Sequence, residues 1–430
     1  MTWSSSEGGH TARLYIALPL FCLWLAGTSI HAASPWTALW ATPAILIAAM
    51  LIAWAAESAQ FFIAQGFALA VLAWLQTLPE FAVEFVLAWK QQVQLLMANL
   101  TGALRLLTGL AWPGIYFIAA IGYRRRSGRP LRRIRLEDEH CVEVVGLLAP
   151  LVYMFWVWAK GSLHLLDAAV LIGIYIAYLW ILRRMPPQEA EKVEDLDWIP
   201  RSIVRARRPV RNALIVGFFV GGGLLIYLSA EPFLASLLAI ATLLGVPYFV
   251  FVQWVAPFIS EFPEKVSAFY WAQTVERAPI GLMNMVSSNI NQWTLLAAML
   301  PIVYSVSRGA PSAIAFDQQQ SLELLMTLGQ SLVGMFFLIN MELAWWEASA
   351  LFVLWFTQFL FSPFPPGESV FGYIAGHIHW WVTLAYLGWS ALAFVRMLMG
   401  KRQPHAFRLF VRMWRMHVLG RPGVPAYHRD

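Results

Sequence analysis

The chain has 430 residues, of which 59% are hydrophobic and only 13% are charged. Because soluble domains carry roughly a quarter charged residues, this composition leaves too little polar surface to coat a water-soluble globule, and it excludes a soluble enzyme and a disordered chain. The net charge of +6 does not indicate nucleic-acid binding, since most of the 30 Lys and Arg residues fall in the segments 122–143, 183–211 and 396–430, a distribution typical of cytoplasmic loops in membrane proteins.

Apolar runs of about 20 residues, long enough to cross a bilayer, recur along the chain and predict an all-α polytopic membrane protein. The expected spans are 13–32, 36–55, 59–89, 93–121, 142–159, 164–182, 212–230, 235–271, 281–306, 321–339, 343–361 and 371–397. The first could instead be a signal peptide, because residues 29–33 resemble a cleavage site, but its weakly charged start favours a retained helix. With twelve spans, both chain ends and the three basic segments lie on the cytoplasmic side.

The longest polar stretch, 183–211, divides the spans into two halves. We expect five helices in the half 36–182 and five in the half 212–361. Residues 1–35 then add a helix or signal before the halves, and residues 362–430 add a helix and a basic tail after them.

One helix of the first half is interrupted. The span 59–89 is too long for a simple crossing, and residues 76–80 (Gln-Thr-Leu-Pro-Glu) stand inside it. Pro79 lacks a helical N–H, so carbonyls one turn earlier lose their partner, and unpaired backbone at membrane depth is tolerated only where it faces protein or a wet cavity. Glu80 stands beside this break, and an ionisable group in a membrane segment is a functional-site candidate by default.

The second half repeats this interruption. The span 235–271 contains Pro-Glu again, which aligns Glu264 with Glu80. The next span in each half opens with an asparagine, Asn99 or Asn284, at 19 or 20 residues beyond the glutamate. An odd number of helices separates the two breaks, so the repeats enter the membrane from opposite sides. Inverted repeats with interrupted helices are the architecture of secondary transporters that bind their substrate near the midplane.

At these residues the sequence resembles the calcium/cation antiporter superfamily, and specifically the membrane region of the sodium/calcium exchangers. The repeats of that family read approximately Gly-Thr-Ser-x-Pro-Glu, followed by Gly-Asn-x-x-Gly-Ser-Asn. The counterparts here are residues 76–80 with 98–103, and residues 260–264 with 283–289. The resemblance covers about 36–361. It implies an inverted repeat of two five-helix halves, with about two additional helices.

The resemblance also implies exchange of a cation against Na⁺ or H⁺ by alternating access. Ca²⁺ suits these residue types, because it is a hard ion that takes carboxylate, carbonyl and hydroxyl oxygens. Without the ion, two close buried carboxylates repel each other, so protonation or Na⁺ binding could replace it. The candidate cation ligands are Glu80, Glu264, Thr77, Ser260, Glu261, Asn99, Asn284 and Ser288. The cations are substrates, and we expect no cofactor.

The chain departs from the sodium-coupled pattern at the positions of further ligands. Those positions hold Ala103 and Leu107 in the first repeat, and Ser288 and Gln292 in the second. Alanine and leucine side chains cannot coordinate a cation. A full set of several Na⁺ sites is therefore not expected.

Charged residues near the motifs add to these departures. Lys265, Glu84 and Arg105 have no counterpart in the family pattern, and Arg105 could occupy a cation position or neutralise Glu84. The departures leave a second hypothesis, a transport-inactive protein of the exchanger fold that acts as a membrane sensor or scaffold. A membrane-embedded enzyme is a third class, but we find no nucleophile motif, His-rich cluster or phosphate loop that supports it.

Outside the repeats, the sequence indicates contact with lipid. Arg408, Arg412 and Arg415 form one face of a basic amphipathic helix, for which anionic lipid is the expected partner. His377 and His379 are expected at the membrane interface and not in a metal site. Composition and basic loops favour the plasma membrane, or the inner membrane of a Gram-negative bacterium.

Overall fold

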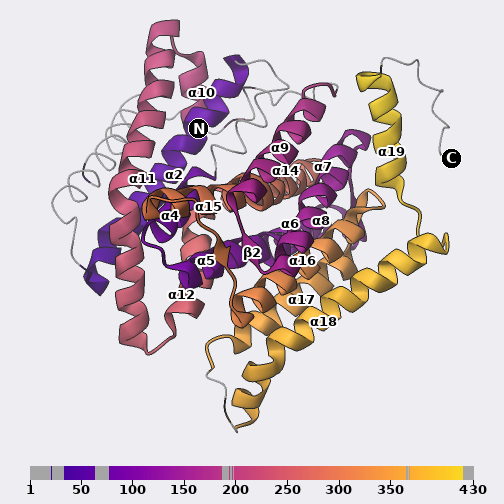
Figure 1. Cartoon of the computed structure of the whole chain (residues 1–430). Helices are drawn as coiled ribbons and strands as arrows, with labels where there is room; N and C mark the ends of the chain where they lie inside the picture. Colours follow the sequence, from indigo (N-terminus) through magenta and orange to yellow (C-terminus); the bar gives the residue numbers. More distant parts are fainter. Residues whose placement is uncertain are drawn as a thin grey trace.

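The structure is a computed structural model that describes residues 21, 33–62, 77–185, 193, 196, 198–364, 367 and 369–419. The expected span 13–32 lies almost wholly outside the described residues, as do residues 63–76 of the span 59–89. Seven of the described helices are long and apolar enough to cross a membrane. Shorter helices pack among them, and together they form an all-α bundle (Figure 1).

The first half supplies helical segments where the apolar runs predict them. In chain order they are η1 (Pro35–Thr37), α2 (Ala38–Ala59), η2 (Gln60–Phe62), α4 (Leu78–Trp89), α5 (Val93–Leu106), η3 (Leu107–Ala111), α6 (Trp112–Ser127), η4 (Asp138–His140), α7 (Cys141–Gly146), α8 (Leu148–Lys160) and α9 (Leu165–Leu182). The segments α5, η3 and α6 form one continuous helical rod.

The second half repeats the order of the first. α10 (Trp198–Arg205) lies in the polar stretch between the halves. The segments of the second half are α11 (Arg208–Leu244), α12 (Tyr248–Ser260), α13 (Phe262–Trp271), α14 (Ala278–Asn291), η6 (Gln292–Leu296), α15 (Ala297–Arg308), α16 (Gln318–Leu338) and α17 (Trp345–Phe361). The rod α14–η6–α15 is the counterpart of α5–η3–α6.

The expected span boundary at 231–234 is wrong, because α11 continues without a break to Leu244. Glu231 does not end the helix, and its carboxylate instead pairs with Lys90 Nζ at 2.5 Å. The chain turns at Gly245, whose φ of +66° lies in the left-handed region. Glycine adopts that conformation without steric cost and commonly follows the end of a helix. The stop signal is therefore this glycine with the proline two residues later.

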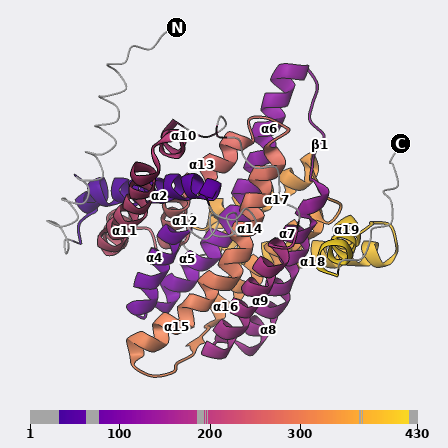
Figure 2. The ribbon, with the colours of Figure 1, turned by 90° about the horizontal axis from the view of Figure 1, so that it is seen from above.

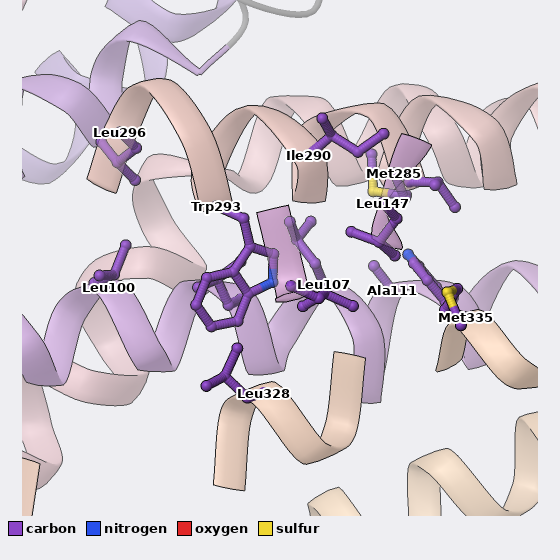
Figure 3. Close-up of a cluster of buried hydrophobic side chains, with 14 of the residues drawn as sticks. Leu100, Leu107, Ala111, Leu147, Met285, Ile290, Trp293, Leu296, Leu328 and Met335 are labelled. Carbon is purple, nitrogen blue, oxygen red and sulfur yellow. The ribbon is translucent and has the colours of Figure 1, made fainter. Parts of the chain in front are cut away.

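Apolar side chains from both halves meet at the centre of the bundle. Trp293 of η6 is fully buried and packs among Leu100, Leu107 and Leu328, as Figure 3 shows. The indole N–H is also hydrogen-bonded, because Trp293 Nε1 donates to Ser331 Oγ at 3.1 Å. The two rods α5–η3–α6 and α14–η6–α15 therefore share one core.

Two short antiparallel strand pairs join the halves. Strand β1 (Arg133–Arg135) pairs with β4 (Glu342–Ala344), and β2 (Ser162–Leu163) pairs with β3 (Ile314–Ala315). β1 and β2 stand at the two ends of the segment η4–α7–α8, so the pairs lie at opposite ends of the bundle. Each pair takes one strand from each half, which is the arrangement that an inverted repeat produces.

The chain adds helices beyond the two halves. They are α18 (Val370–Leu398), α19 (His405–Met413) and the π-helical turn η7 (Trp414–Val418). α18 packs along α16 and α17, while α2 and α11 pack on each other. Figures 1 and 2 show α2 and α11 on one side of the bundle and α18 and α19 on the other.

Candidate functional site

The predicted glutamate of the first half lies at the start of α4. Thr77 precedes the helix, and Pro79 stands in its first turn, where a missing N–H removes no helical hydrogen bond. Glu80 follows in that first turn and is completely buried. Thr77 Oγ1 accepts a hydrogen bond from Asn291 Nδ2 at 2.7 Å, so the start of α4 is bonded to the second half.

The second half places its Pro-Glu motif in the same way, at the start of α13, and we call the start of α4 and the start of α13 the two corners. α12 ends at Ser260, Glu261 stands between the helices, and Pro263 lies in the first turn of α13. Glu264 follows that proline, and both glutamates are buried. The Ser260 hydroxyl donates within its own helix to the carbonyl of Pro257 at 3.4 Å.

One amide connects the two corners. Gln292 Nε2 donates to Glu80 Oε2 at 2.8 Å and to Glu261 Oε1 at 2.7 Å. The other oxygen of Glu261 pairs with the ammonium of Lys265. All four side chains are buried. The structure thus brings together predicted carboxyls of opposite halves, through a glutamine that the sequence presented only as a departure.

Two more carboxyls lie beside this bridge. Glu84 Oε1 accepts a hydrogen bond from Asn99 Nδ2 at 3.0 Å, and neither oxygen of Glu264 has a hydrogen-bond partner among the described residues. Glu80 interacts electrostatically with the other three carboxyls and with Lys265. We name these residues the central cluster: Glu80, Glu84, Glu261, Glu264, Lys265 and Gln292.

The remaining predicted ligands lie around the central cluster with different partners. Ser288 is buried, and its side chain lies beside the Glu264 carboxyl. Asn284 is half-buried, and its Nδ2 has no partner in the described part of the chain. Asn99 is hydrogen-bonded to Glu84. The hydroxyls of Thr77 and Ser260 are bonded as described above.

The helices behind the two corners change their winding at equivalent positions. A π-helical turn covers Leu107–Ala111 in one rod and Gln292–Leu296 in the other. Each turn begins eight residues after the asparagine of its repeat, Asn99 or Asn284. Such turns are frequent at functional sites, and here the second one begins at the residue that bridges the carboxyls. Hydrophobic periodicity does not indicate them.

A close approach of backbones holds α5 against α12. A Cβ atom on Gly102 would lie 1.8 Å from the carbonyl oxygen of Gln253. That carbonyl is available because Pro257, four residues later, has no N–H to donate to it. The first half therefore packs directly on the interrupted helix of the second half.

A second buried cluster involves residues whose role the sequence did not give. Arg105 pairs with Glu323 Oε2 at 2.6 Å. Of the two possibilities that the sequence left open for it, the structure does not show neutralisation of Glu84. His379 also reaches this acid, because its Nδ1 lies 2.6 Å from Glu323 Oε1. The reason is that α18 packs along α16 and carries His379 to that acid. An acidic residue inside an apolar helix is the signal that identifies Glu323.

The central cluster offers donors suited to a hard cation. Carboxylate and amide oxygens are ligands that Ca²⁺ takes in proteins, and Asn291 Oδ1 and Gln292 Oε1 have no hydrogen-bond partner among the described residues. No group of three or more His, Cys, Asp or Glu side chains is gathered for a metal ion within the described ranges. In this conformation Gln292 and Lys265 instead engage the carboxyls.

Comparisons with known proteins agree with this architecture. The family model described as sodium/calcium exchanger protein matches residues 33–183 and 214–363. The crystal structure of an H⁺/Ca²⁺ exchanger, CAX, is 30% identical, covers 96% of this chain and 99% of its own, and superposes with a TM-score of 0.83. The Ca²⁺/H⁺ antiporter protein YfkE shares the fold at 13% identity, with 81% and 99% covered and a TM-score of 0.55. No curated protein matches the chain.

The two matched segments coincide with the two halves of the bundle, and each contains one corner of the central cluster. The resemblance inferred from the motifs is therefore confirmed, as is the inverted-repeat fold. The protein is an integral multi-pass membrane protein of a transporter family. It belongs to the sodium/calcium exchanger protein family.

Proposed function

We propose that the protein is a secondary-active antiporter that exchanges Ca²⁺ for H⁺ by alternating access at the central cluster. The observation that carries this proposal is the bridge from Gln292 Nε2 to Glu80 and Glu261, because it places carboxyls of the two inverted halves on one buried amide. A site built from both halves changes when they move relative to each other, as alternating access requires. The choice of ions is supported by the 30% identical H⁺/Ca²⁺ exchanger.

Charge balance supports a divalent substrate. Glu80, Glu261 and Glu264 together carry three negative charges when ionised, and Lys265 carries one positive charge. Two net charges remain, which one Ca²⁺ neutralises; Glu84 is left out of this count because its carboxyl is already bonded to Asn99. A net charge inside the membrane is costly, so protons or other cations must take the place of the divalent cation when it leaves. Release of the divalent cation is therefore coupled to the uptake of the replacing cations, which is exchange.

Protons suit the coupling role better than Na⁺. Ala103 and Leu107 are buried hydrocarbon side chains at positions where sodium-coupled members of the family carry oxygen ligands.

The other cation ligands in the proposal are Thr77, Ser260, Asn99, Asn284 and Ser288. The transporter acts in the plasma membrane, or the inner membrane of a Gram-negative cell, with the basic segments in the cytoplasm and anionic lipid around them.

A transport-inactive sensor or scaffold is the second candidate, and one observation favours it. Lys265 and Gln292 already engage Glu261 and Glu80 inside the cluster. If these contacts never open, the carboxyls cannot take a cation.

The test is Ca²⁺ uptake into proteoliposomes under an imposed H⁺ or Na⁺ gradient. Wild type is compared with Glu80→Gln and Glu264→Gln, which keep the side-chain shape and remove the charge. We expect H⁺-driven uptake in wild type, and uptake at the level of protein-free vesicles in both variants. The matched control is Glu342→Gln, which makes the same change in a partly exposed pair with Arg133 and retains uptake.

The gradients separate the candidates. Uptake driven by Na⁺ alone would overturn proton coupling and leave cation exchange standing. A folded wild-type protein that moves no Ca²⁺ under either gradient would support the scaffold instead.

A further inference from the structure

Lys265 is a lysine buried inside a cluster of carboxyls. Its side chain is 3% exposed and that of Glu261, its partner one helical turn earlier, is 1% exposed. Lysine is almost never fully buried unless it is paired. Its ammonium is a compact point charge on a flexible stem, so it can hold a position beside a carboxylate and also leave it. Here the stem is anchored in α13, next to Glu264.

The two halves differ at this pair. Aligning Glu80 with Glu264 places Thr77 opposite Glu261 and Phe81 opposite Lys265. The second half therefore carries an acid and a base where the first half carries a hydroxyl and an aromatic ring. The pair adds one negative and one positive charge together, so the net charge of the cluster is unchanged. Glu261 is thus an additional carboxylate, and Lys265 is the counter-ion that the protein itself supplies for it.

Resting on the proposed function, we propose that Lys265 is a specificity-determining residue that acts as a tethered monovalent cation. Its ammonium occupies a cation position at Glu261, and the transported ion must displace it from that carboxylate. Glu261 is also the carboxyl that Gln292 connects to Glu80. A cation held between the two halves therefore meets this ammonium.

The competition discriminates between ions by charge. A monovalent ion that displaces the ammonium replaces one positive charge by another and gains no Coulomb energy at Glu261. A divalent ion doubles the attraction to the same carboxylate. Lys265 therefore excludes Na⁺ from the central cluster and admits divalent cations, at a lowered affinity for both.

The test measures ⁴⁵Ca²⁺ binding to the purified full-length protein in lipid nanodiscs, at one fixed pH, in choline buffer with and without Na⁺. In Lys265→Met we expect Ca²⁺ to bind roughly tenfold tighter or more, because a positive charge is removed from beside the ligands, and we expect Na⁺ to compete. In wild type Na⁺ does not compete. Adding Glu261→Gln to Lys265→Met removes the gain in affinity. The matched control is Lys90→Met, which breaks the half-exposed pair with Glu231 and leaves binding unchanged.

A gain in affinity cannot result from a damaged fold, so the expected result is specific. Should Lys265→Met not elute as a folded monodisperse protein, Lys265→Gln removes the charge while its amide still donates to Glu261. Equal or weaker Ca²⁺ binding by the folded variant, beside a wild type that binds, overturns the tethered-cation role and leaves the proposed function intact. Binding by neither protein overturns both. Ca²⁺ binding by Lys265→Met but not by wild type would support the role of Lys265 and would mean that the wild-type protein does not transport Ca²⁺.

Discussion

The amide of Gln292 has two N–H donors, and both are used on carboxylate oxygens, one from each half of the molecule. Its Oε1 atom then remains an acceptor without a partner in the described part of the chain. One side chain thus supports the carboxyls and presents an amide oxygen beside them. Both are functions that a cation site requires, and a leucine such as Leu107, at the equivalent position, provides neither.

Gly102 gives a prediction at the scale of one residue. In Gly102→Ala the new methyl group meets a backbone oxygen at 1.8 Å, so α5 and α12 must separate. We expect a loss of about 1–3 kcal/mol or more in the free energy of unfolding, the usual cost of overpacking, seen as a lower thermal unfolding midpoint of the purified protein. Gly223→Ala is the control, because its Cβ meets open space. Equal midpoints for the two variants would contradict the close approach.

The sequence identified some residues of the central cluster and missed others for physical reasons. Glu80 and Glu264 could be predicted because a carboxyl beside a proline inside a membrane span has few structural explanations. The role of Gln292 could not be predicted, since this residue begins a π-helical turn, and such a turn leaves no trace in hydrophobic periodicity. The partner of Arg105 lies on α16, and only packing between the halves selects Glu323 over Glu84.

At the scale of helices, the starts of α4 and α13 could be predicted from local chemistry, whereas other helix boundaries could be predicted less well. Proline in the first turn of α4 and α13 leaves little choice about where those helices start. The acid and proline at 231–232 resemble a stop of the same kind, yet α11 passes through them. The difference is tertiary: Lys90 supplies the charge that Glu231 needs, and lipid-facing helices tolerate proline where neighbours stabilise them.

The strand pairs give a prediction at the scale of secondary-structure elements. Ser162 and Ala315 are directly opposed in the β2–β3 pair, and opposed residues of antiparallel strands have Cα atoms about 4.5–5.5 Å apart, within the range of a disulfide. We expect Ser162→Cys with Ala315→Cys to cross-link under mild oxidation and to raise stability by about 2–4 kcal/mol. Proteolysis between the two positions, with fragments held together until reduction, measures the cross-link. Ser162→Cys alone is the control. Failure to cross-link would show that the strands part.

Across the whole molecule, Glu323 joins three parts of the chain. It pairs with Arg105 of the first half, lies on α16 of the second half, and contacts His379 of the added helix α18. Gln253 Nε2 also donates to it at 3.0 Å. The additional helix is thus bound to the buried charge network of the bundle and is not a peripheral attachment.

This arrangement gives a prediction about stability. Arg105→Gln leaves Glu323 buried without its strongest partner, and breaking one side of a buried pair costs about 3–5 kcal/mol. We expect a clearly lower thermal midpoint for Arg105→Gln, and a smaller loss when Glu323→Gln is added, because the uncompensated charge is then gone. Unfolding of the three proteins in the same detergent measures the difference. A double variant less stable than Arg105→Gln would exclude the pairing as the cause.

The buried pair also has a consequence for biosynthesis. Synthesis runs from the N-terminus, so Arg105 enters the membrane long before Glu323 and His379 have been made. Its guanidinium, which has a high cost in hydrocarbon, must stay near water or inside the insertion machinery until the second half arrives. The first half is therefore completed late, when α16 delivers the carboxylate and α18 packs over it, long after the guanidinium entered the membrane.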